Sequence, residues 1–176
     1  MKSEEDEFAR FFAESYPGLC RFLECLLGGG RAAAEDLAQE SFMRLHRKGL
    51  ESLPGDEARF WLFRVARNLA LNELGRRQTR RRLFEKVVAA FAAPAPDPER
   101  AYEASEQRGL VLELLERLPE PQRAALLLRE QEEMSYREIA AVLGVSEAKV
   151  KVDIFRARST MRDRWARTGR AKEVAG

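Results

Sequence analysis

Histidine and cysteine are scarce in this sequence. Its 176 residues include one histidine, His46, and two cysteines, Cys20 and Cys25. A single imidazole excludes a histidine-cluster metal site, and two thiols cannot form a four-thiolate zinc site or a disulfide framework. The two thiols would lie about 140° apart around a helix, so we expect buried, reduced cysteines rather than a redox sensor. These counts argue against an enzyme, and they predict no metal, no cofactor and no small-molecule substrate.

Long apolar runs and strand patterns are missing as well. No run approaches the ~18 apolar residues that a membrane span needs. The N-terminal sequence MKSEEDEF is acidic, whereas a signal peptide is basic and then apolar. We therefore expect a cytoplasmic protein that is not inserted in a membrane. Helical spacing of apolar residues occurs throughout, which predicts an all-α fold.

Charge is segregated along the chain, although the net charge is only +2. The net charges of residues 1–57, 58–82, 83–148 and 149–176 are −5, +7, −6 and +6, respectively. A solvated surface usually mixes its signs. The two basic segments therefore predict two contacts with a polyanion, and the acidic segments predict faces for basic partners.

Three prolines divide the chain. Pro94, Pro96 and Pro98 alternate with small or acidic residues, which excludes a helix and favours an extended spacer. We place a linker at residues 86–99, between two small helical domains at residues 1–85 and 100–176.

Apolar spacing predicts four helices in each domain. A first helix carries Phe8, Phe11 and Phe12, and a second begins at Pro17 and ends at the glycines 28–30. The predicted inward residues of the third helix are Ala34, Leu37, Ala38, Phe42 and Leu45. Those of a long fourth helix are Ala58, Trp61, Leu62, Val65 and Leu69. In the second domain, the predicted helices cover residues 100–117, 121–131, 135–143 and 146–165.

The last two helices have the spacing of a helix-turn-helix. Ala140 is small where the helices cross, Gly144 permits a left-handed turn, and Val150 is the apolar residue that holds the second helix on the first. Ser135 with Glu138 has capping-box spacing, and Ser146 is a predicted N-cap. The predicted core stripe of the last helix is Val150, Ile154, Ala157, Met161 and Trp165. Its outward cations are Lys149, Lys151, Arg156 and Arg158. They favour DNA binding over the alternative, a helical hairpin with a solvated basic face.

Two polar surfaces are predicted in the first domain. One is a cluster on the third helix, made of Glu35, Asp36, Gln39 and Glu40. It is either a partner site or a solvated acidic face, and nothing beside it suggests acid–base catalysis. The other is a ridge of residues spaced by four along the fourth helix, made of Arg64, Asn68, Asn72 and Arg76. Five arginines in residues 76–82 continue it, a pattern suited to single-stranded DNA. Trp61 is expected to pack in the core rather than stack on bases.

Three ordered segments resemble a known family. AEDLAQESFMRLHR resembles region 2.2 of the sigma-70 family of transcription initiation factors, and FWLFRVARNLALNELGRR resembles regions 2.3 and 2.4. LPEPQRAALLLREQEEMSYREIAAVLGVSEAKVKVDIFRAR resembles region 4. The short chain, with region 4 following region 2, is similar to the extracytoplasmic-function (ECF) group. The resemblance implies a promoter-melting domain, a linker and a helix-turn-helix domain, both held on core RNA polymerase, which performs the chemistry.

The resemblance also assigns residues and partners. The residues that match the surface docking on the β′ clamp of core polymerase are Glu35, Asp36, Gln39 and Glu40. The residues that match the surface recognising and opening the −10 element are Asn68, Asn72, Arg76 and Arg77. Arg64 is added to this predicted site because it belongs to the same ridge. The helix that reads the −35 element is matched by Lys149, Lys151, Val152, Phe155 and Arg156, with Ser146 at its start. The implied partners are core polymerase with its β′ clamp and β flap, promoter DNA as duplex and melted strand, and an anti-sigma factor.

The sequence departs from the family at three positions. His46 stands where the family often has tryptophan, which we expect to be a packing change. Val152 and Asp153 replace a small polar residue and a basic one. We expect Asp153 to repel phosphate, so relatives do not predict the −35 sequence. Two other functions stay open: a stand-alone helix-turn-helix repressor or activator, and an RNA-binding adaptor. Both would bind nucleic acid without polymerase.

Overall fold

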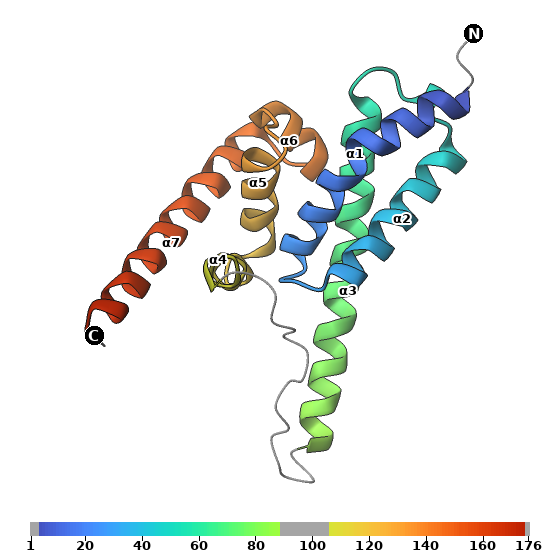
Figure 1. The fold of residues 1–176 in the computed structure, drawn as a ribbon. Coiled ribbons are helices and arrows are strands. Elements are labelled where there is room, and N and C mark those ends of the chain that lie inside the picture. Colours follow the sequence, from blue (N-terminus) through green and yellow to red (C-terminus); the bar gives the residue numbers. More distant parts are fainter. Residues whose placement is uncertain (1–3, 89–105, 175–176) are drawn as a thin grey trace.

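The computed structural model describes residues 4–88 and 106–174. Within these ranges the chain forms α-helices and one short 3-10 helix, with no strand, which confirms the all-α prediction (Figure 1). The elements are α1 (Glu4–Leu26), α2 (Arg31–Lys48), η1 (Leu50–Ser52), α3 (Glu57–Val88), α4 (Glu106–Glu116), α5 (Glu120–Glu130), α6 (Tyr136–Leu143) and α7 (Glu147–Val174). None of the helices described here is long and apolar enough to cross a membrane.

Pro17 lies inside α1, so the predicted break between two helices is wrong. A proline in a helix interior removes one hydrogen bond and costs about 3 kcal/mol. Burial on both sides of the proline offsets this cost. Before it, Phe12 and Tyr16 pack on Phe42 of α2, and their ring centroids lie 4.7 and 6.0 Å, respectively, from the centroid of the Phe42 ring. After it, the fully buried side chains are Leu19, Phe22, Leu23 and Leu26. Each of these contributes about 1.5–3 kcal/mol, which together exceeds the cost.

The glycine run ends α1 as predicted. Gly28, Gly29 and Gly30 all have positive φ, at 73°, 105° and 89°. The Gly29 N–H donates to the carbonyl of Glu24 at 2.8 Å, which closes the last turn of the helix. Residues with a Cβ rarely adopt this backbone conformation, so three successive glycines allow the chain to reverse into α2.

The helices α1, α2 and α3 form the first domain. The predicted inward residues of α2 are buried, except Leu37, which is half-buried. In α3 the buried stripe differs from the prediction: Phe63, Ala66 and Ala70 join Ala58 and Leu62, whereas Trp61, Val65 and Leu69 are half-buried. Apolar residues cover more than one side of α3, so their spacing alone does not select the inward face. Packing does, because the Phe63 ring meets that of Phe22 edge to face at 5.4 Å.

The second domain contains the helix-turn-helix formed by α6 and α7. The Glu138 N–H donates to Ser135 Oγ at 3.3 Å, and the Ser135 N–H donates to the Glu138 carboxylate at 2.5 Å, which confirms the capping box. The bond from the Ser135 N–H lowers the pKa of the Glu138 carboxyl. Gly144 has φ 68° and ψ 36°, and Val150 is fully buried. The Lys149 N–H donates to Ser146 Oγ at 3.2 Å, so Ser146 caps α7 as predicted.

Replacing Ser135 by alanine is expected to destabilise the chain by about 1 kcal/mol, because the Glu138 N–H loses its acceptor. Chemical denaturation measures this difference. Ser135→Asp is the matched control, since aspartate is an equally good N-cap residue and should restore the stability. Equal stability of the alanine and aspartate variants would contradict a capping role for Ser135.

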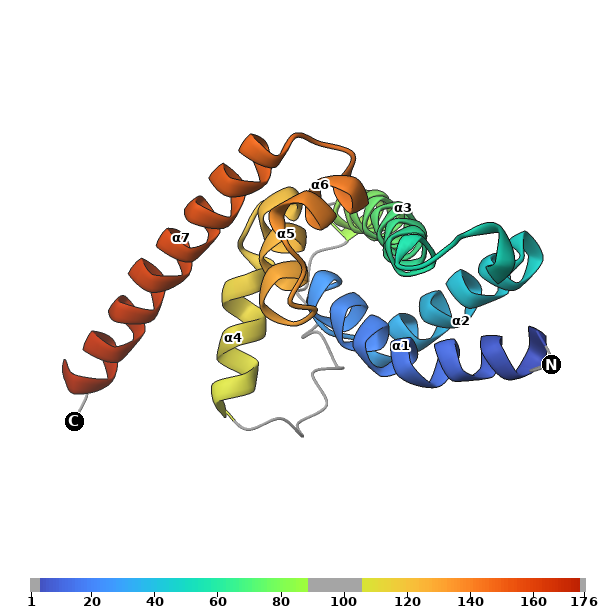
Figure 2. The same cartoon turned by 90° about the horizontal axis from the view of Figure 1, so that it is seen from above.

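The helix α7 continues beyond its predicted end at Trp165. Val150, Ile154 and Ala157 are buried as predicted, but Met161 is half-buried and Trp165 is 50% exposed. The predicted core stripe is therefore wrong at Trp165. A helix of 28 residues is about 42 Å long. Its C-terminal half extends past the short helices α4 and α5, as Figure 2 shows.

The two domains pack against each other. The helix α1 contacts α4 and α5, and α3 contacts α6. In Figures 1 and 2 the helices α1–α3 lie on one side of the molecule and α4–α7 on the other. The helix α3 runs to Val88, into the segment predicted as a linker, and residues 89–99 of that segment lie outside the described residues.

Candidate nucleic-acid and partner interfaces

The polar ridge of α3 lies largely on solvent-exposed surface. Asn68, Asn72 and Arg76 are exposed, and within the described part of the chain neither asparagine side chain has a hydrogen-bond partner. Their amides are therefore free to bond a base edge. Arg64, at the start of the ridge, is exposed but donates to the carbonyl of Ala141 in α6.

Arg77 lies beside the ridge rather than on it. Its side chain is half-buried, and its Nε donates to Glu73 at 3.0 Å while its Nη1 donates to the carbonyl of Leu27 at 3.4 Å. The arginines that follow it, Arg80, Arg81 and Arg82, are exposed. The basic end of α3 is thus open to a polyanion.

The aromatic residues upstream of the ridge are largely taken up by packing. Phe63 is fully buried, and Phe60 and Trp61 are half-buried against the core. The Lys48 ammonium lies over the Trp61 ring, 5.9 Å from its centroid. This agrees with a packing role for Trp61.

The first turns of α7 present an apolar and basic face. Val152 is 43% exposed and Phe155 is 74% exposed, and Lys151 and Arg156 beside them are also exposed. A phenylalanine this exposed leaves most of its ring in water, which is unfavourable unless another molecule covers it. The face combines apolar contact with positive charge, as a helix that enters the major groove does.

Asp153 points into the domain, so the expected repulsion of phosphate is wrong. Its side chain is 3% exposed, and Lys149 Nζ donates to both carboxylate oxygens at 2.6 Å. The carboxylate therefore neutralises Lys149 rather than facing the surface. Arg158 is also paired, with its Nη2 2.5 Å from Glu130. Lys151 and Arg156 remain as cations without a carboxylate partner among the described residues.

The acidic cluster of α2 is partly neutralised by arginines of the same helix. Glu35 pairs with Arg31 at 2.8 Å, and Glu40 pairs with Arg44 at 2.8 Å. The bond from Arg44 lowers the pKa of the Glu40 carboxyl, which keeps it ionised. The remaining members, Asp36 and Gln39, are exposed. These pairs span one helical turn on the surface, so they add little to stability.

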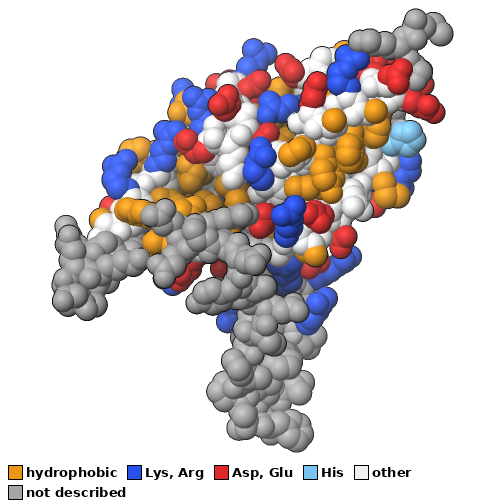
Figure 3. Space-filling view, in the orientation of Figure 1, with side chains coloured by type: hydrophobic (Ala, Val, Ile, Leu, Met, Phe, Trp, Pro, Cys, Tyr) orange, Lys and Arg blue, Asp and Glu red, His pale blue; other side chains and the backbone are white. Residues whose placement is uncertain are grey.

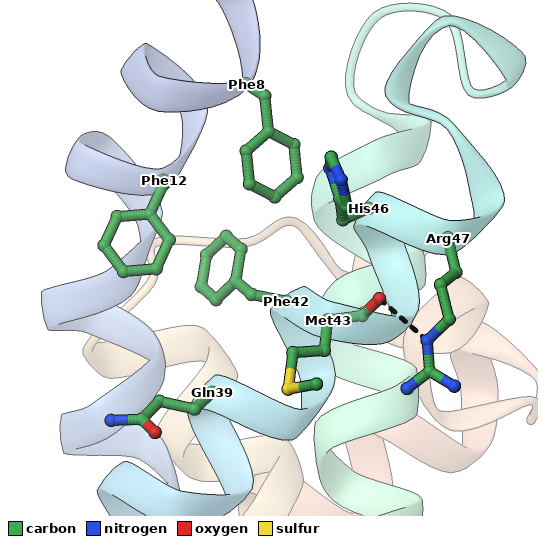
Figure 4. Close-up of a pocket in the computed structure, with 7 residues that line it drawn as sticks. All are labelled: Phe8, Phe12, Gln39, Phe42, Met43, His46 and Arg47. Atoms are coloured by element: carbon green, nitrogen blue, oxygen red, sulfur yellow. Dashed lines mark hydrogen bonds between the residues drawn. The ribbon is translucent and has the colours of Figure 1, made fainter. Parts of the chain in front are cut away.

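An apolar groove beside this cluster was not predicted from the sequence. It lies between α1 and α2, has a volume of about 580 Å³, and is lined by Phe8, Phe12, Gln39, Phe42, Met43, His46 and Arg47 (Figure 4). Met43 is 57% exposed. Figure 3 shows the hydrophobic side chains gathered near His46. One signal in the sequence could have predicted the groove. Met43 is an apolar residue four positions after Gln39, so it lies on the polar side of the helix rather than on its buried face.

Neither cysteine forms a disulfide, and both are half-buried. Burial raises the pKa of the Cys20 thiol, so it stays protonated at neutral pH. Cys25 Sγ accepts a hydrogen bond from Gln131 at 3.4 Å. Both observations agree with a packing role. No cluster of metal-ligating side chains occurs in residues 4–88 and 106–174.

The chain matches two family models in the expected order. Residues 11–81 match "Sigma-70 region 2", and residues 108–161 match "Sigma-70, region 4". The ECF RNA polymerase sigma-E factor of Salmonella typhimurium LT2 is 36% identical over 135 residues, which are 72% of this chain and 70% of the relative. The RNA polymerase sigma-H factor of Pseudomonas aeruginosa is 36% identical over 137 residues, 73% of this chain and 70% of the relative. The chain belongs to the sigma-70 family, within its ECF group.

Solved structures agree with this fold. The sigma factor RpoE of Bartonella quintana, in complex with the anti-sigma factor NepR, superposes with a TM-score of 0.66 at 25% identity, covering 89% of this chain and 95% of that one. CnrH in complex with the cytosolic domain of CnrY gives 0.67 at 21% identity, covering 94% and 90%. Some curated relatives are longer: the chain spans about half (53%) of the length of the ECF RNA polymerase sigma factor SigE of Mycolicibacterium smegmatis.

Proposed function

We propose that this protein is an alternative sigma factor, which binds core RNA polymerase, directs it to specific promoters and helps open the DNA. The observation that carries the proposal is the pair of free amides, Asn68 and Asn72, on the basic helix of the region 2 match. A simple duplex-binding repressor has no need of them. Residues 1–85 then bind polymerase and the −10 element, residues 100–176 bind the −35 element, and the segment between them, whose first residues continue α3 to Val88, joins the two.

Two kinds of DNA contact divide between the domains. The α3 ridge offers amides that can pair with an exposed base edge, and arginines that can hold the neighbouring phosphates. The residues proposed to contact the −10 element are Arg64, Asn68, Asn72, Arg76 and Arg77. The α7 face suits intact duplex, with Phe155 and Val152 for base methyl groups and with Lys151 and Arg156, which have no carboxylate partner among the described residues, for phosphate. The residues proposed for the −35 element are Ser146, Lys149, Lys151, Val152, Phe155 and Arg156.

Core polymerase is the proposed partner of α2. The carboxylates there suit a basic partner surface such as the β′ clamp. The adjacent groove with Met43 offers apolar surface that a partner can bury, which adds to the affinity that charge provides. A second contact, with the β flap, is supported by exposed apolar residues on the other domain. These are Val111 of α4 and Trp165 of α7, which are 37% and 50% exposed.

An anti-sigma factor is a further proposed partner. The RpoE structure that covers most of this chain is a complex with an anti-sigma factor. The proposed function also places the protein in the cytoplasm, on the nucleoid when it is active. It assigns no catalytic residue to this chain, because the polymerase makes the RNA.

The test is reconstitution of transcription. The purified chain is mixed with core RNA polymerase and sheared genomic DNA of its source, and the 5′ ends of the transcripts are sequenced. We expect a small set of start sites that require both proteins. The free chain should bind duplex DNA weakly and with steep salt dependence. Tight sequence-specific binding by the free chain, without polymerase-dependent transcripts, would identify a stand-alone repressor instead.

A further inference from the structure

Gly75 of α3 is a helical glycine that the fold itself does not require. A Cβ atom built on it would meet no atom of the described chain within 4 Å. Its φ is not positive, so an alanine could adopt the same backbone conformation. A glycine in a helix interior is destabilising relative to alanine, because it loses more backbone freedom on folding. Among the described residues, therefore, neither packing nor backbone geometry explains this glycine.

Gly75 faces away from the rest of the first domain. Arg77, two residues later, donates to the carbonyl of Leu27 and so lies on the side of α3 that packs on the domain. Two successive steps along a helix turn it by about 200°, which places Gly75 on the opposite side. Gly75 is exposed, and in Figure 1 the C-terminal part of α3 extends away from α1 and α2. The backbone at this point is open to another molecule.

The missing side chain leaves a groove along α3, here called the Gly75 notch. It has a volume of about 720 Å³ and is lined by Leu71, Asn72, Gly75, Arg76, Thr79 and Arg80. The Thr79 hydroxyl donates to the Gly75 carbonyl at 3.0 Å, so both groups have a partner within the helix. Leu71 is half-buried beside them. The floor of the notch is therefore mainly apolar, whereas its rim carries one amide and two guanidinium groups.

The cations on the rim are open to a ligand. Arg76 and Arg80 are exposed and have no carboxylate partner among the described residues. No acidic residue occurs in residues 74–82. The two arginines are four residues apart, which is about 6 Å along the helix axis. A ligand that lies along the notch would thus meet two positive charges in succession, with the free amide of Asn72 beside them.

One nucleotide of a DNA strand has the chemistry that this arrangement selects. Deoxyribose is a compact ring with mostly C–H surface, and it can approach the helix backbone closely only where no Cβ intervenes. The phosphates on its two sides suit Arg76 and Arg80. The attached base then lies near Asn72, whose amide can bond a base edge. In a duplex the pairing edge of the base is occupied, so a single strand fits the notch better.

We propose that the Gly75 notch is the seat of one deoxyribose–phosphate unit of single-stranded DNA, and that Gly75 sets how closely the strand approaches α3. The polar ridge supplies hydrogen bonds and charge, and Gly75 supplies the space. The place of this seat at the −10 element rests on the proposed function. Binding of a single strand in the notch is a property of the free chain and is tested on it.

Gly109 of α4 provides a matched control. It is also an exposed helical glycine, and a Cβ atom built on it would also meet no atom of the described chain within 4 Å. It lies outside α3 and away from the notch. The same substitution at Gly75 and at Gly109 therefore makes the same chemical change, and only the first places atoms in the notch.

The first measurement is NMR of the free chain with ¹⁵N in its glycines only. The chain has 11 glycines, so the spectrum holds at most 11 backbone signals. The variants G75A and G109A each lack one signal, which identifies Gly75 and Gly109. Addition of a mixed-sequence single-stranded oligonucleotide of about 12 nucleotides should shift or broaden the Gly75 signal. The Gly109 signal should stay in place.

The second measurement is the affinity for the same oligonucleotide, read by fluorescence anisotropy at about 50 mM salt. Alanine and leucine fill the notch to different extents without changing the net charge. G75A should bind at least about threefold and G75L at least about tenfold more weakly than the parent chain, whereas G109A and G109L should bind as the parent does. The oligonucleotide annealed to its complement is the second arm, in which G75L should lose less affinity.

Thermal denaturation separates loss of binding from loss of folding. Alanine is the better helix former, so G75A and G109A should each raise the melting temperature by about 1–4 °C. A variant that is more stable than the parent and binds DNA more weakly has lost a binding site rather than its fold.

Three results would overturn the seat: a Gly75 signal that the single strand leaves unchanged, equal affinities of G75L and G109L, or a loss of affinity confined to the duplex. None of them depends on transcription. A chain with the expected Gly75 responses but no polymerase-dependent transcripts would reject the proposed function and keep the seat. A chain that transcribes while G75L and G109L bind the single strand equally would do the reverse.

Discussion

Replacing Asn68 and Asn72 together by alanine is expected to reduce transcription from a duplex promoter by at least about tenfold. A base taken out of the stack costs a few kcal/mol, which contacts made only in the open state have to offset. Each amide–base pair is worth about 1–3 kcal/mol. Both asparagines are exposed and lack a partner among the described residues, so the chain loses no internal contact when they are removed.

The measurement is transcription together with permanganate footprinting on duplex and pre-melted bubble templates. The asparagine variant should form the closed complex normally, fail to melt the duplex, and recover most of its activity on the bubble. A variant with Lys151 and Arg156 replaced by alanine is the contrast, since it should bind both templates more weakly. Equal defects of the asparagine variant on both templates would assign these residues to recognition of the exposed strand rather than to opening. Full activity of the asparagine variant on the duplex would show that the ridge is a solvent-exposed helix face with no role in opening DNA.

Reversing Asp36 and Glu40 to lysine should weaken binding to core polymerase by about 2–5 kcal/mol, because attraction to a basic partner becomes repulsion. Both residues lie off the buried face of α2, and the Glu40–Arg44 pair is largely exposed, with side chains 37% and 48% accessible. Folding should therefore be unchanged, which thermal denaturation checks.

The affinity is measured by competition with a labelled sigma factor for core polymerase. The matched control is E51K/E57K, which makes the same charge change at exposed positions of the same domain, outside α2. It should bind as the parent does. Equal affinity of D36K/E40K and E51K/E57K would remove α2 from the polymerase contact and leave the groove beside it without its proposed partner.

The segregated charge of the chain allows the arginines of α3 two kinds of partner, the carboxylates of the second domain and a polyanion. Arg67 and Arg59 of α3 pair with Glu120 and Glu132 of the second domain, whereas exposed arginines of the same helix are the ones proposed to contact DNA. Salt weakens both interactions, but the interdomain pairs are partly buried and so are screened less than contacts with DNA.

Local features of this protein were determined by the sequence. The capping box of Ser135, the left-handed turn at Gly144, the glycine end of α1 and the four-residue spacing of the α3 ridge depend on residues within one or two helical turns. Backbone geometry fixes such relations, so spacing and residue type predict them. The family followed from three such segments in order.

Tertiary structure decided the features that depend on contacts between helices. The helix α1 continues through Pro17, and Phe63 is buried. Asp153 is buried and paired with Lys149, whereas Trp165 is exposed. Tertiary structure also formed the groove beside α2 and brought Glu120 and Glu132 to α3. These outcomes depend on burial free energies summed over partners distant in the sequence. The summed burial free energy outweighs the local cost of a proline in a helix or of a buried charge. It cannot be predicted from the spacing of residues along one helix, because the partners come from other helices.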